Sequence, residues 1–511
     1  MRTNPRIFRS AGVVSLGTLS SRLLGLVREV LMAWAFGTTA AGSAFVVAFT
    51  IPNLFRRLFG EGALSAAFVP SYILVRDKKG PEAAWTLTRN LISLLILVLG
   101  GISLLGMLGA GWALTLPDLP PKTADTLRTL RVMFPYMIGI CLAAVMMGVL
   151  NSHRKYVVSA FTPCLLNLVW IAALAGVALV PDLTPSEKIL WISWAVLGAG
   201  VLQFAVQIPA VRALGYTRTA PVNPLGPEVR RVLTLMGPAA LGAAVTQVNV
   251  LLDRLLAFWV GDYGPTALSY SERLIYLPLG LFATALGTIL LPEFSGLVQQ
   301  NDREELGHTL DRSLRALSFI MLPAAVGLAV LAVPVVRLIF ERGEFDALST
   351  QRTARALVCY APGLVVFSAA KIFIPLFYAH GDTRTPVRVG VLAVGVNLVL
   401  NLLFIFTLPA EWKHAGLALG TVASVLLQVG VLAMLTQRRY AHLHGRPLLR
   451  SLLRQTLACV PMAAVAVGGV HLAAPLPAWI GVPAAIAAAA LVYLATAALL
   501  RCPELSELRE H

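Results

Sequence analysis

The stretch SRLLGLVREVLMAWAFGTTAAGSAFVVAFTIPNLFRRLFGE, Ser21–Glu61, decides how the rest of the chain is interpreted. It holds two apolar segments of membrane-spanning length, joined by a short turn. Six ionisable residues lie inside these segments: Arg22, Arg28, Glu29, Arg56, Arg57 and Glu61. An ionisable group in hydrocarbon costs about 2.5–3.5 kcal/mol on insertion scales, so such groups usually face a bundle interior or a water-filled cavity. The stretch therefore predicts a membrane hairpin with a functional polar lining.

The whole chain shares this apolar character. Of its 511 residues, 57% are hydrophobic and only 13% are charged, with a mean hydropathy of +0.77. A soluble domain carries about a quarter charged residues, and a membrane β-barrel would show ten-residue alternating segments. The excess of 41 Lys and Arg over 25 Asp and Glu is explained by basic cytoplasmic loops, so we expect no nucleic-acid partner. The composition predicts an all-α polytopic membrane protein.

Apolar runs predict fourteen transmembrane helices. They lie near residues 11–36, 43–74, 90–115, 127–150, 157–181, 187–211, 229–260, 265–298, 314–340, 353–379, 386–408, 415–437, 451–474 and 478–500. Loops rich in Arg and Lys alternate with poorer ones, which places both termini in the cytoplasm.

The first twelve spans contain an internal repeat. Residues recur at offsets near 222–230, as in the pairs Pro70 and Pro292, Pro135 and Pro362, and Asn167 and Asn397. Because six spans is an even number, the two copies share one orientation, with a pseudo-twofold axis along the membrane normal and a cavity at the midplane. We therefore expect a first lobe at 1–220, a second at 221–440, and two extra helices at 441–511. The extra pair either packs passively or forms a groove for a lipid chain.

Arginines within the expected spans are the main candidates for substrate binding. Arg28 and Arg273, one in each lobe, lie roughly 12–13 Å from the outer ends of their spans. Arg22 and Arg56 lie deeper. A guanidinium suits bidentate contact with phosphate, so the sequence predicts a phosphate- or diphosphate-bearing substrate. The alternative is that these groups form internal ion pairs.

Acidic neighbours bear on that alternative. Glu29 and Glu272 each stand beside an arginine in the sequence. The candidates for supporting or gating roles are Glu29, Glu61 and Glu272. Glu61 follows Arg57 by four residues, so we expect those two to form an ion pair.

A second candidate site lies in the second lobe. Asp253 is intramembrane, and Asn397 and Asn401 share one helix face. Together they offer oxygen ligands to a monovalent cation; the alternative is that Arg254 neutralises Asp253 and that the amides join helices. Lys371 is a lone intramembrane cation that either pairs with a carboxylate or contacts substrate.

Four segments carry a resemblance to a known family. They are SRLLGLVRE (21–29), AFVVAFTIPNLFRRLFGEGALSAAFVP (44–70), SERLIYLPLGLFATALGTILLP (271–292) and KHAGLALG (413–420). With the span count, they make the chain similar to the MurJ/MviN family, the lipid II flippases of the multidrug/oligosaccharidyl-lipid/polysaccharide exporter superfamily. The most specific segment is PNLFRRLFGEGA, Pro52–Ala63. The resemblance covers essentially the full length.

The resemblance implies flipping of undecaprenyl-diphosphate-linked lipid II to the outer leaflet of the bacterial inner membrane by alternating access. The family's important arginines fall on Arg22, Arg28, Arg56 and Arg273. A sodium ion near the seventh and eleventh helices is also implied, which again selects Asp253, Asn397 and Asn401. Where relatives commonly carry Asp, this chain has Ser43. The extra helices would form the groove for the lipid tail.

We therefore expect a monomeric transporter with lipid II and membrane lipids as partners. It would need no cofactor, and a sodium ion or the membrane potential would supply the driving force. One rival is a flippase for another polyprenyl-diphosphate-linked saccharide. A membrane glycosyltransferase is a second rival, but the sequence has no HExxH motif, no paired-carboxylate motif and no catalytic residue we can name. A scaffold protein is the third.

Overall fold

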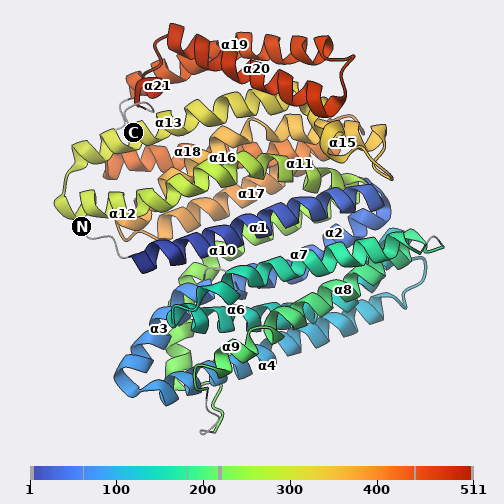
Figure 1. Ribbon diagram of the computed structural model, residues 1–511, viewed down its shortest axis with the longest axis vertical. Coiled ribbons are helices and arrows are strands. Elements are labelled where there is room, and N and C mark those ends of the chain that lie inside the picture. The colour runs from blue at the N-terminus through green and yellow to red at the C-terminus, as the bar shows by residue number, and fades with distance from the viewer. Residues whose placement is uncertain (1–4, 61–62, 181, 217–220, 442–444, 508–511) are drawn as a thin grey trace. The chain divides into compact units, whose positions relative to one another are not determined.

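The computed structural model describes residues 5–60, 63–180, 182–216, 221–441 and 445–507, and throughout these ranges the regular elements are helices (Figure 1). The chain divides into two compact units, Met1–Leu251 and Leu252–His511. Their boundary falls inside helix α10, Pro227–Val260. The division at residues 220 and 440 follows the sequence repeat, and it stays a prediction.

The first unit is built from helices on the N-terminal side of α10. They are α1 (Pro5–Phe36), α2 (Ala40–Phe55), the π-helix η1 (Arg56–Gly60), α3 (Ala63–Lys79), α4 (Pro81–Ala113), α5 (Pro121–Met133), α6 (Tyr136–Ser152), α7 (Tyr156–Ala178), α8 (Pro185–Ala205) and α9 (Ile208–Arg212).

The second unit continues from α10. Its further helices are α11 (Gly264–Pro278), the π-helix η2 (Leu279–Ala283), α12 (Thr284–Gln300), α13 (Arg303–Val330), α14 (Ala332–Phe340), α15 (Ala347–Tyr360), α16 (Gly363–Ala379), α17 (Arg384–Thr407), α18 (Lys413–Arg439), α19 (Gly445–Leu472), α20 (Ala478–Leu499) and α21 (Pro503–Glu507).

The order of elements repeats along the chain. Helices α1 and α2 are followed by η1 and α3, and helices α10 and α11 are followed by η2 and α12. A proline, Pro52 or Pro278, stands shortly before each π segment. Its ring removes the N–H that would bond to the carbonyl four residues earlier, and the wider π turn follows this disturbance of the ladder. The repeat seen in the sequence is therefore also present in the secondary structure.

The predicted spans each contain a helix or an interrupted helix. Among the described residues, ten helices are long and apolar enough to cross a membrane, or eleven if α15 and α16, bent by 45° at their junction, form one span. Some predicted spans are not among these long apolar helices. One is α1, which carries Arg22, Arg28 and Glu29, and two others are the spans that η1 and η2 interrupt. Charge and irregular backbone are what a lipid-facing helix avoids.

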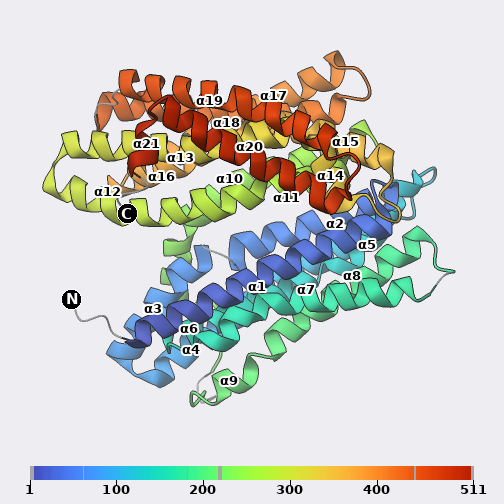
Figure 2. The ribbon, with the colours of Figure 1, turned by 45° about the horizontal axis from the view of Figure 1, so that its top comes forward.

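The last two long helices pack together, and α19 also lies along α13 (Figures 1 and 2). The Tyr493 hydroxyl on α20 donates to the Phe319 carbonyl on α13 at 2.9 Å. Glu504 is only 1% exposed, forms an ion pair with Arg315 at 3.5 Å, and accepts a hydrogen bond from Ser451. These contacts attach the C-terminal helices to the second unit, and their role as a lipid-tail groove stays a prediction.

Helices α6 and α8 approach closely where glycines replace side chains. A Cβ atom at Gly139 would lie 2.7 Å from the carbonyl carbon and oxygen of Gly200, and one at Gly200 would lie 2.7 Å from Cδ2 of Tyr136. Because backbone atoms occupy the space beside Gly139, no side-chain rotation relieves the clash. Small residues are typical of such close helix contacts in membranes.

This contact predicts a loss of stability for Gly139→Ala of about 1–3 kcal/mol, because the helices must separate. Gly100→Ala on α4 is the matched control, since its Cβ would meet no atom within 4 Å. That variant should be neutral or slightly stabilised, because alanine favours helix over glycine. Thermal unfolding of the purified chain in detergent measures both, and equal melting temperatures would contradict the packing.

Candidate functional site

Arg28 is held in one orientation on α1. It is 8% exposed, its Nη2 donates to Glu29 Oε1 at 2.6 Å, and its Nη1 donates to Asn167 Oδ1 on α7 at 2.9 Å. The guanidinium carbon also lies 4.4 Å from the ring centroid of Trp170, within the range of a cation–π contact. The sequence placed Glu29 beside Arg28, but it did not reveal Asn167 or Trp170 as its partners.

Asn167 also ties α7 to α1 through the backbone. Its Nδ2 donates to the carbonyl of Ser21 at 3.0 Å while its Oδ1 accepts from Arg28. One turn earlier on α1, a Cβ at Gly17 would lie 2.6 Å from the carbonyl oxygen of Ala160. The two helices are therefore in close contact along this stretch, and the amide fixes the depth at which Arg28 is presented.

Two further arginines begin the π-helix η1. Arg56 is half-buried, and its Nε donates to Asn53 Oδ1 at 2.7 Å. Arg57 is exposed, and its Nη1 donates to Gln247 Oε1 on α10 at 3.4 Å. The predicted ion pair between Arg57 and Glu61 stays a prediction, because Glu61 lies outside the described residues.

The remaining predicted cations are exposed. Arg22 lies on α1 of the first unit, whereas Arg273 lies on α11 and Lys371 on α16 of the second. Ser43 is fully buried on α2.

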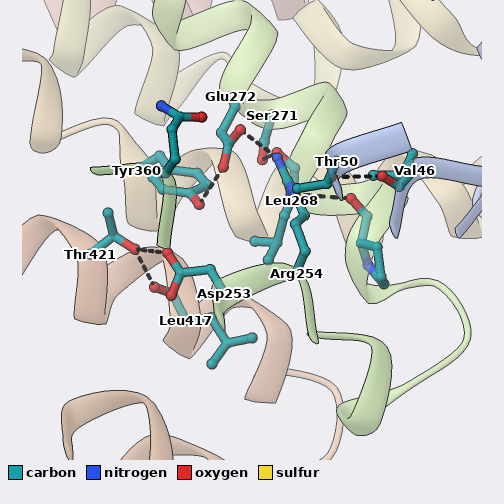
Figure 3. Close-up of polar contacts among 12 residues, drawn as sticks. Val46, Thr50, Asp253, Arg254, Leu268, Ser271, Glu272, Tyr360, Leu417 and Thr421 are labelled. Carbon is teal, nitrogen blue, oxygen red and sulfur yellow. Dashed lines mark hydrogen bonds and ion pairs between the residues drawn. The ribbon is translucent and has the colours of Figure 1, made fainter. Parts of the chain in front are cut away.

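Asp253, Asn397 and Asn401 converge in the second unit, as the sequence suggested. Asn401 Nδ2 donates to Asp253 Oδ1 at 2.6 Å and also to Asn397 Oδ1. The hydroxyl of Thr421 on α18 donates to Asp253 Oδ2 at 3.0 Å, as Figure 3 shows, and accepts from Asn397 Nδ2 at 3.3 Å. Thr421 was missed from the sequence, because a hydroxyl in an apolar helix carries no charge that marks it.

Arg254 pairs with a different acid from the one beside it in the sequence. Its Nη2 donates to Glu272 Oε2 on α11 at 2.5 Å, and the Tyr360 hydroxyl on α15 donates to Glu272 Oε1 at 3.0 Å (Figure 3). Glu272 therefore joins α10, α11 and α15.

The acids of the two units occupy matching places but meet different partners. Glu29 and Asp253 each stand eight residues before a glycine, Gly37 or Gly261, whose N–H bonds to a carbonyl one turn earlier. In the first unit Arg28 places a permanent positive charge against Glu29. In the second unit Asp253 accepts hydrogen bonds from a neutral amide and a neutral hydroxyl, while Arg254 pairs with Glu272.

The cluster around Asp253 is chemically suited to a small monovalent cation. Its oxygens come from one carboxylate, two amides and one hydroxyl, and oxygen donors suit hard cations. Asn401 is fully buried, and no described residue donates a hydrogen bond to its Oδ1. A buried acceptor of this kind costs free energy unless a donor or a cation satisfies it. The residues present therefore fit a bound cation.

Solved structures share this fold. A structure described as lipid II flippase MurJ in an inward-closed conformation matches with a TM-score of 0.78 at 23% identity, covering 95% of this chain and 98% of that one. An inward-facing multidrug resistance transporter of the MATE family and MOP superfamily matches with a TM-score of 0.67 at 14% identity, covering 82% and 94%. The chain thus has the fold of the MOP-superfamily membrane transporters.

Sequence comparison then identifies the family within this class of transporters. The family model described as lipid II flippase MurJ matches residues 32–478. The lipid II flippase MurJ of Burkholderia cenocepacia is 37% identical over 422 residues, 81% of this chain and 80% of that one. A probable lipid II flippase MurJ of Rhizobium meliloti is 36% identical over 464 residues, 88% and 84% of the two chains. The chain belongs to the lipid II flippase MurJ family, so it is an integral membrane transporter rather than an enzyme.

Proposed function

We propose that the chain moves lipid II, the undecaprenyl-diphosphate-linked peptidoglycan precursor, from the cytoplasmic to the outer leaflet of the bacterial inner membrane. The observation that carries this proposal is the 37% identity to a named lipid II flippase over four fifths of both chains. The protein works as a monomer by alternating access, with both termini in the cytoplasm. Basic residues inside spans support an anionic substrate over a neutral one.

The diphosphate of the substrate is bound by arginine side chains. A diphosphate presents several anionic oxygens, and each guanidinium can contact two of them at once. In the first unit, Arg22 stands six residues before Arg28 on α1, or about 9 Å along the helix. Arg56 on η1 is the third guanidinium of that unit. Glu29 acts as a supporting acid that orients Arg28 rather than as a substrate ligand.

The second unit contributes to diphosphate binding through α11. Arg273 supplies a further exposed guanidinium, and the adjacent Glu272 is fixed by Arg254 and Tyr360. Because α10 also carries Asp253, a change at that acid reaches α11 through Arg254 and Glu272. Glu272 is therefore proposed as the supporting acid of this unit, and Glu61 as a gating acid on the basis of sequence.

Transport also needs a driving force, because a ligand shifts an equilibrium only by its differential affinity for the two states. Asp253, Asn397, Asn401 and Thr421 would hold a sodium ion, whose chemistry at the site is charge neutralisation of the carboxylate. The sodium gradient then favours one conformation of the second unit. The membrane potential is the alternative driving force.

Complementation of a flippase-depleted bacterium tests the proposed function. Expression of the chain should restore growth and normal cell shape, and the lipid II that accumulates with empty vector should fall to the level in undepleted cells. An independent blot of the membrane fraction reports that the chain is present. Lysis with undiminished lipid II, despite normal amounts of the chain in the membrane, would contradict the proposal and favour another lipid-linked saccharide.

A further inference from the structure

The first unit contains a pocket that the proposed transport does not use. It has a volume of about 750 Å³ and lies among α1, α3, α6 and α7. Aliphatic side chains such as Val69, Ile73 and Met147 form part of its wall, while Arg76 and Arg154 also line it. None of the described lining residues is acidic. An apolar wall with two guanidinium groups is typical of a site for an anionic amphiphile.

Arg154 occupies a backbone position that favours glycine. It has φ 57° in the turn after α6, where the N–H of Lys155 bonds to the Leu150 carbonyl at 2.9 Å. The matching turn after α16 has the same bond, from Asp382 to Phe377 at 3.0 Å, but there Gly381 takes the left-handed position with φ 72°. An L-residue in this conformation is disfavoured relative to glycine. Strain of this kind is commonly found where a side chain has a function.

The guanidinium of Arg154 is available to a ligand. Its side chain is exposed, and its only hydrogen bond to a described residue is made by its backbone N–H, to Asn151 at 3.0 Å. Arg76 is more constrained, because its Nη1 donates to the Ser152 carbonyl at 3.2 Å and its Nε to Asp77 at 3.0 Å. Arg154 is therefore the principal unneutralised cation of the pocket.

Two other basic residues stand beside it. Burial and the positive charge of Arg76 lower the pKa of His153, which therefore stays neutral near pH 7. Lys155 is exposed and is not part of the pocket lining. The positive charge inside the pocket thus comes from arginine alone, and Lys155 offers a control of equal charge outside it.

We propose that this pocket binds the phosphate headgroup of an anionic membrane lipid, with Arg154 as the phosphate ligand. The aliphatic wall accommodates the start of the acyl chains, and Arg76 provides a second, fixed positive charge. The site is separate from the binding of lipid II, so its presence does not depend on the proposed transport. A free sugar or a neutral lipid would leave Arg154 without a counter-charge.

Native mass spectrometry of the full chain in detergent tests the site, with phosphatidylglycerol as the anionic lipid, phosphatidylcholine as the zwitterionic one and inorganic phosphate as the free anion. The wild-type chain should bind phosphatidylglycerol more tightly than phosphatidylcholine. Arg154→Gly should weaken phosphatidylglycerol binding about tenfold and leave phosphatidylcholine binding unchanged. Its melting temperature should be equal to or higher than that of wild type, because glycine suits φ 57°.

Lys155→Gln is the matched control, and it should change phosphatidylglycerol binding by less than about twofold. Three results would each overturn the proposal. The first is wild-type phosphatidylglycerol affinity in Arg154→Gly. A second is an equal loss of phosphatidylglycerol affinity in Lys155→Gln, which would show that the lipid is held by non-specific electrostatic attraction to the basic surface. The third is displacement of the lipid by inorganic phosphate at an equal concentration, which would assign the pocket to a free anion.

Discussion

Replacement of Arg28 by glutamine should abolish lipid II export in flippase-depleted cells, with precursor accumulating as it does without the protein. The guanidinium is held in one orientation, because Glu29 and Asn167 each accept a hydrogen bond from one of its terminal nitrogens. A lost charge-assisted contact weakens binding about 10- to 100-fold. The variant also leaves Glu29 without this ion pair, which by itself costs about 3–5 kcal/mol when the pair is buried.

A double variant separates these two effects. Arg28→Gln with Glu29→Gln removes both charges, so the stability lost in the single variant should largely return. Export should nevertheless stay absent, because no guanidinium remains at that position. The measurements are the melting temperature of the purified chain and the amount of lipid II in cells. Restored export in the double variant would show that Arg28 is only a structural partner of Glu29.

Asp253→Asn should abolish the response of the chain to sodium. A ligand that binds only the folded state stabilises it by RT ln(1 + [L]/Kd), or about 2.7 kcal/mol at 100 times Kd. The melting temperature of the wild-type chain should therefore be higher in sodium chloride than in choline chloride of equal ionic strength. The variant should show no difference between the two salts. A sodium-dependent shift that survives in Asp253→Asn would contradict the assignment of the site.

A glycine substitution next to Asn401 tests the same site without changing the charge of any residue in it. A Cβ at Gly420 on α18 would clash with the Asn401 amide oxygen, whereas one at Gly430 on the same helix would meet no atom within 4 Å. Gly420→Ala should therefore weaken sodium binding, so that the apparent Kd obtained from the sodium-dependent stabilisation rises about tenfold. Gly430→Ala should behave as wild type. Equal sodium responses in the two variants would exclude Asn401 from the site.

The helical fold could be predicted from the sequence because hydropathy is additive along a span. The expected spans at 43–74 and 265–298 were nevertheless predicted as continuous, whereas η1 and η2 interrupt them. Hydropathy does not depend on which carbonyl each N–H bonds to. An α-helical turn and a π turn of the same sequence therefore have the same hydropathy. The sequence signal next to each break is a proline, Pro52 or Pro278.

Pairing of charges was harder to predict than their presence. Sequence adjacency had suggested that Asp253 and Glu272 would each be linked to the arginine that follows it. Consecutive helical residues point in different directions, and Arg254 reaches Glu272 on the next helix instead. Contacts across helices, such as Arg28 with Asn167 or Asp253 with Thr421, depend on packing that one sequence does not specify.

Movement of fluorescent lipid II in proteoliposomes of the purified full-length chain is the most direct test of the proposed transport. A membrane-impermeant quencher reports how fast lipid II from the inner leaflet reaches the outer one. Wild-type chain should accelerate this step for lipid II but not for a fluorescent phosphatidylcholine, and the Arg28→Gln, Glu29→Gln double variant should be inactive. Rates equal to those of protein-free vesicles, or equal acceleration of both lipids, would contradict lipid II transport by this chain.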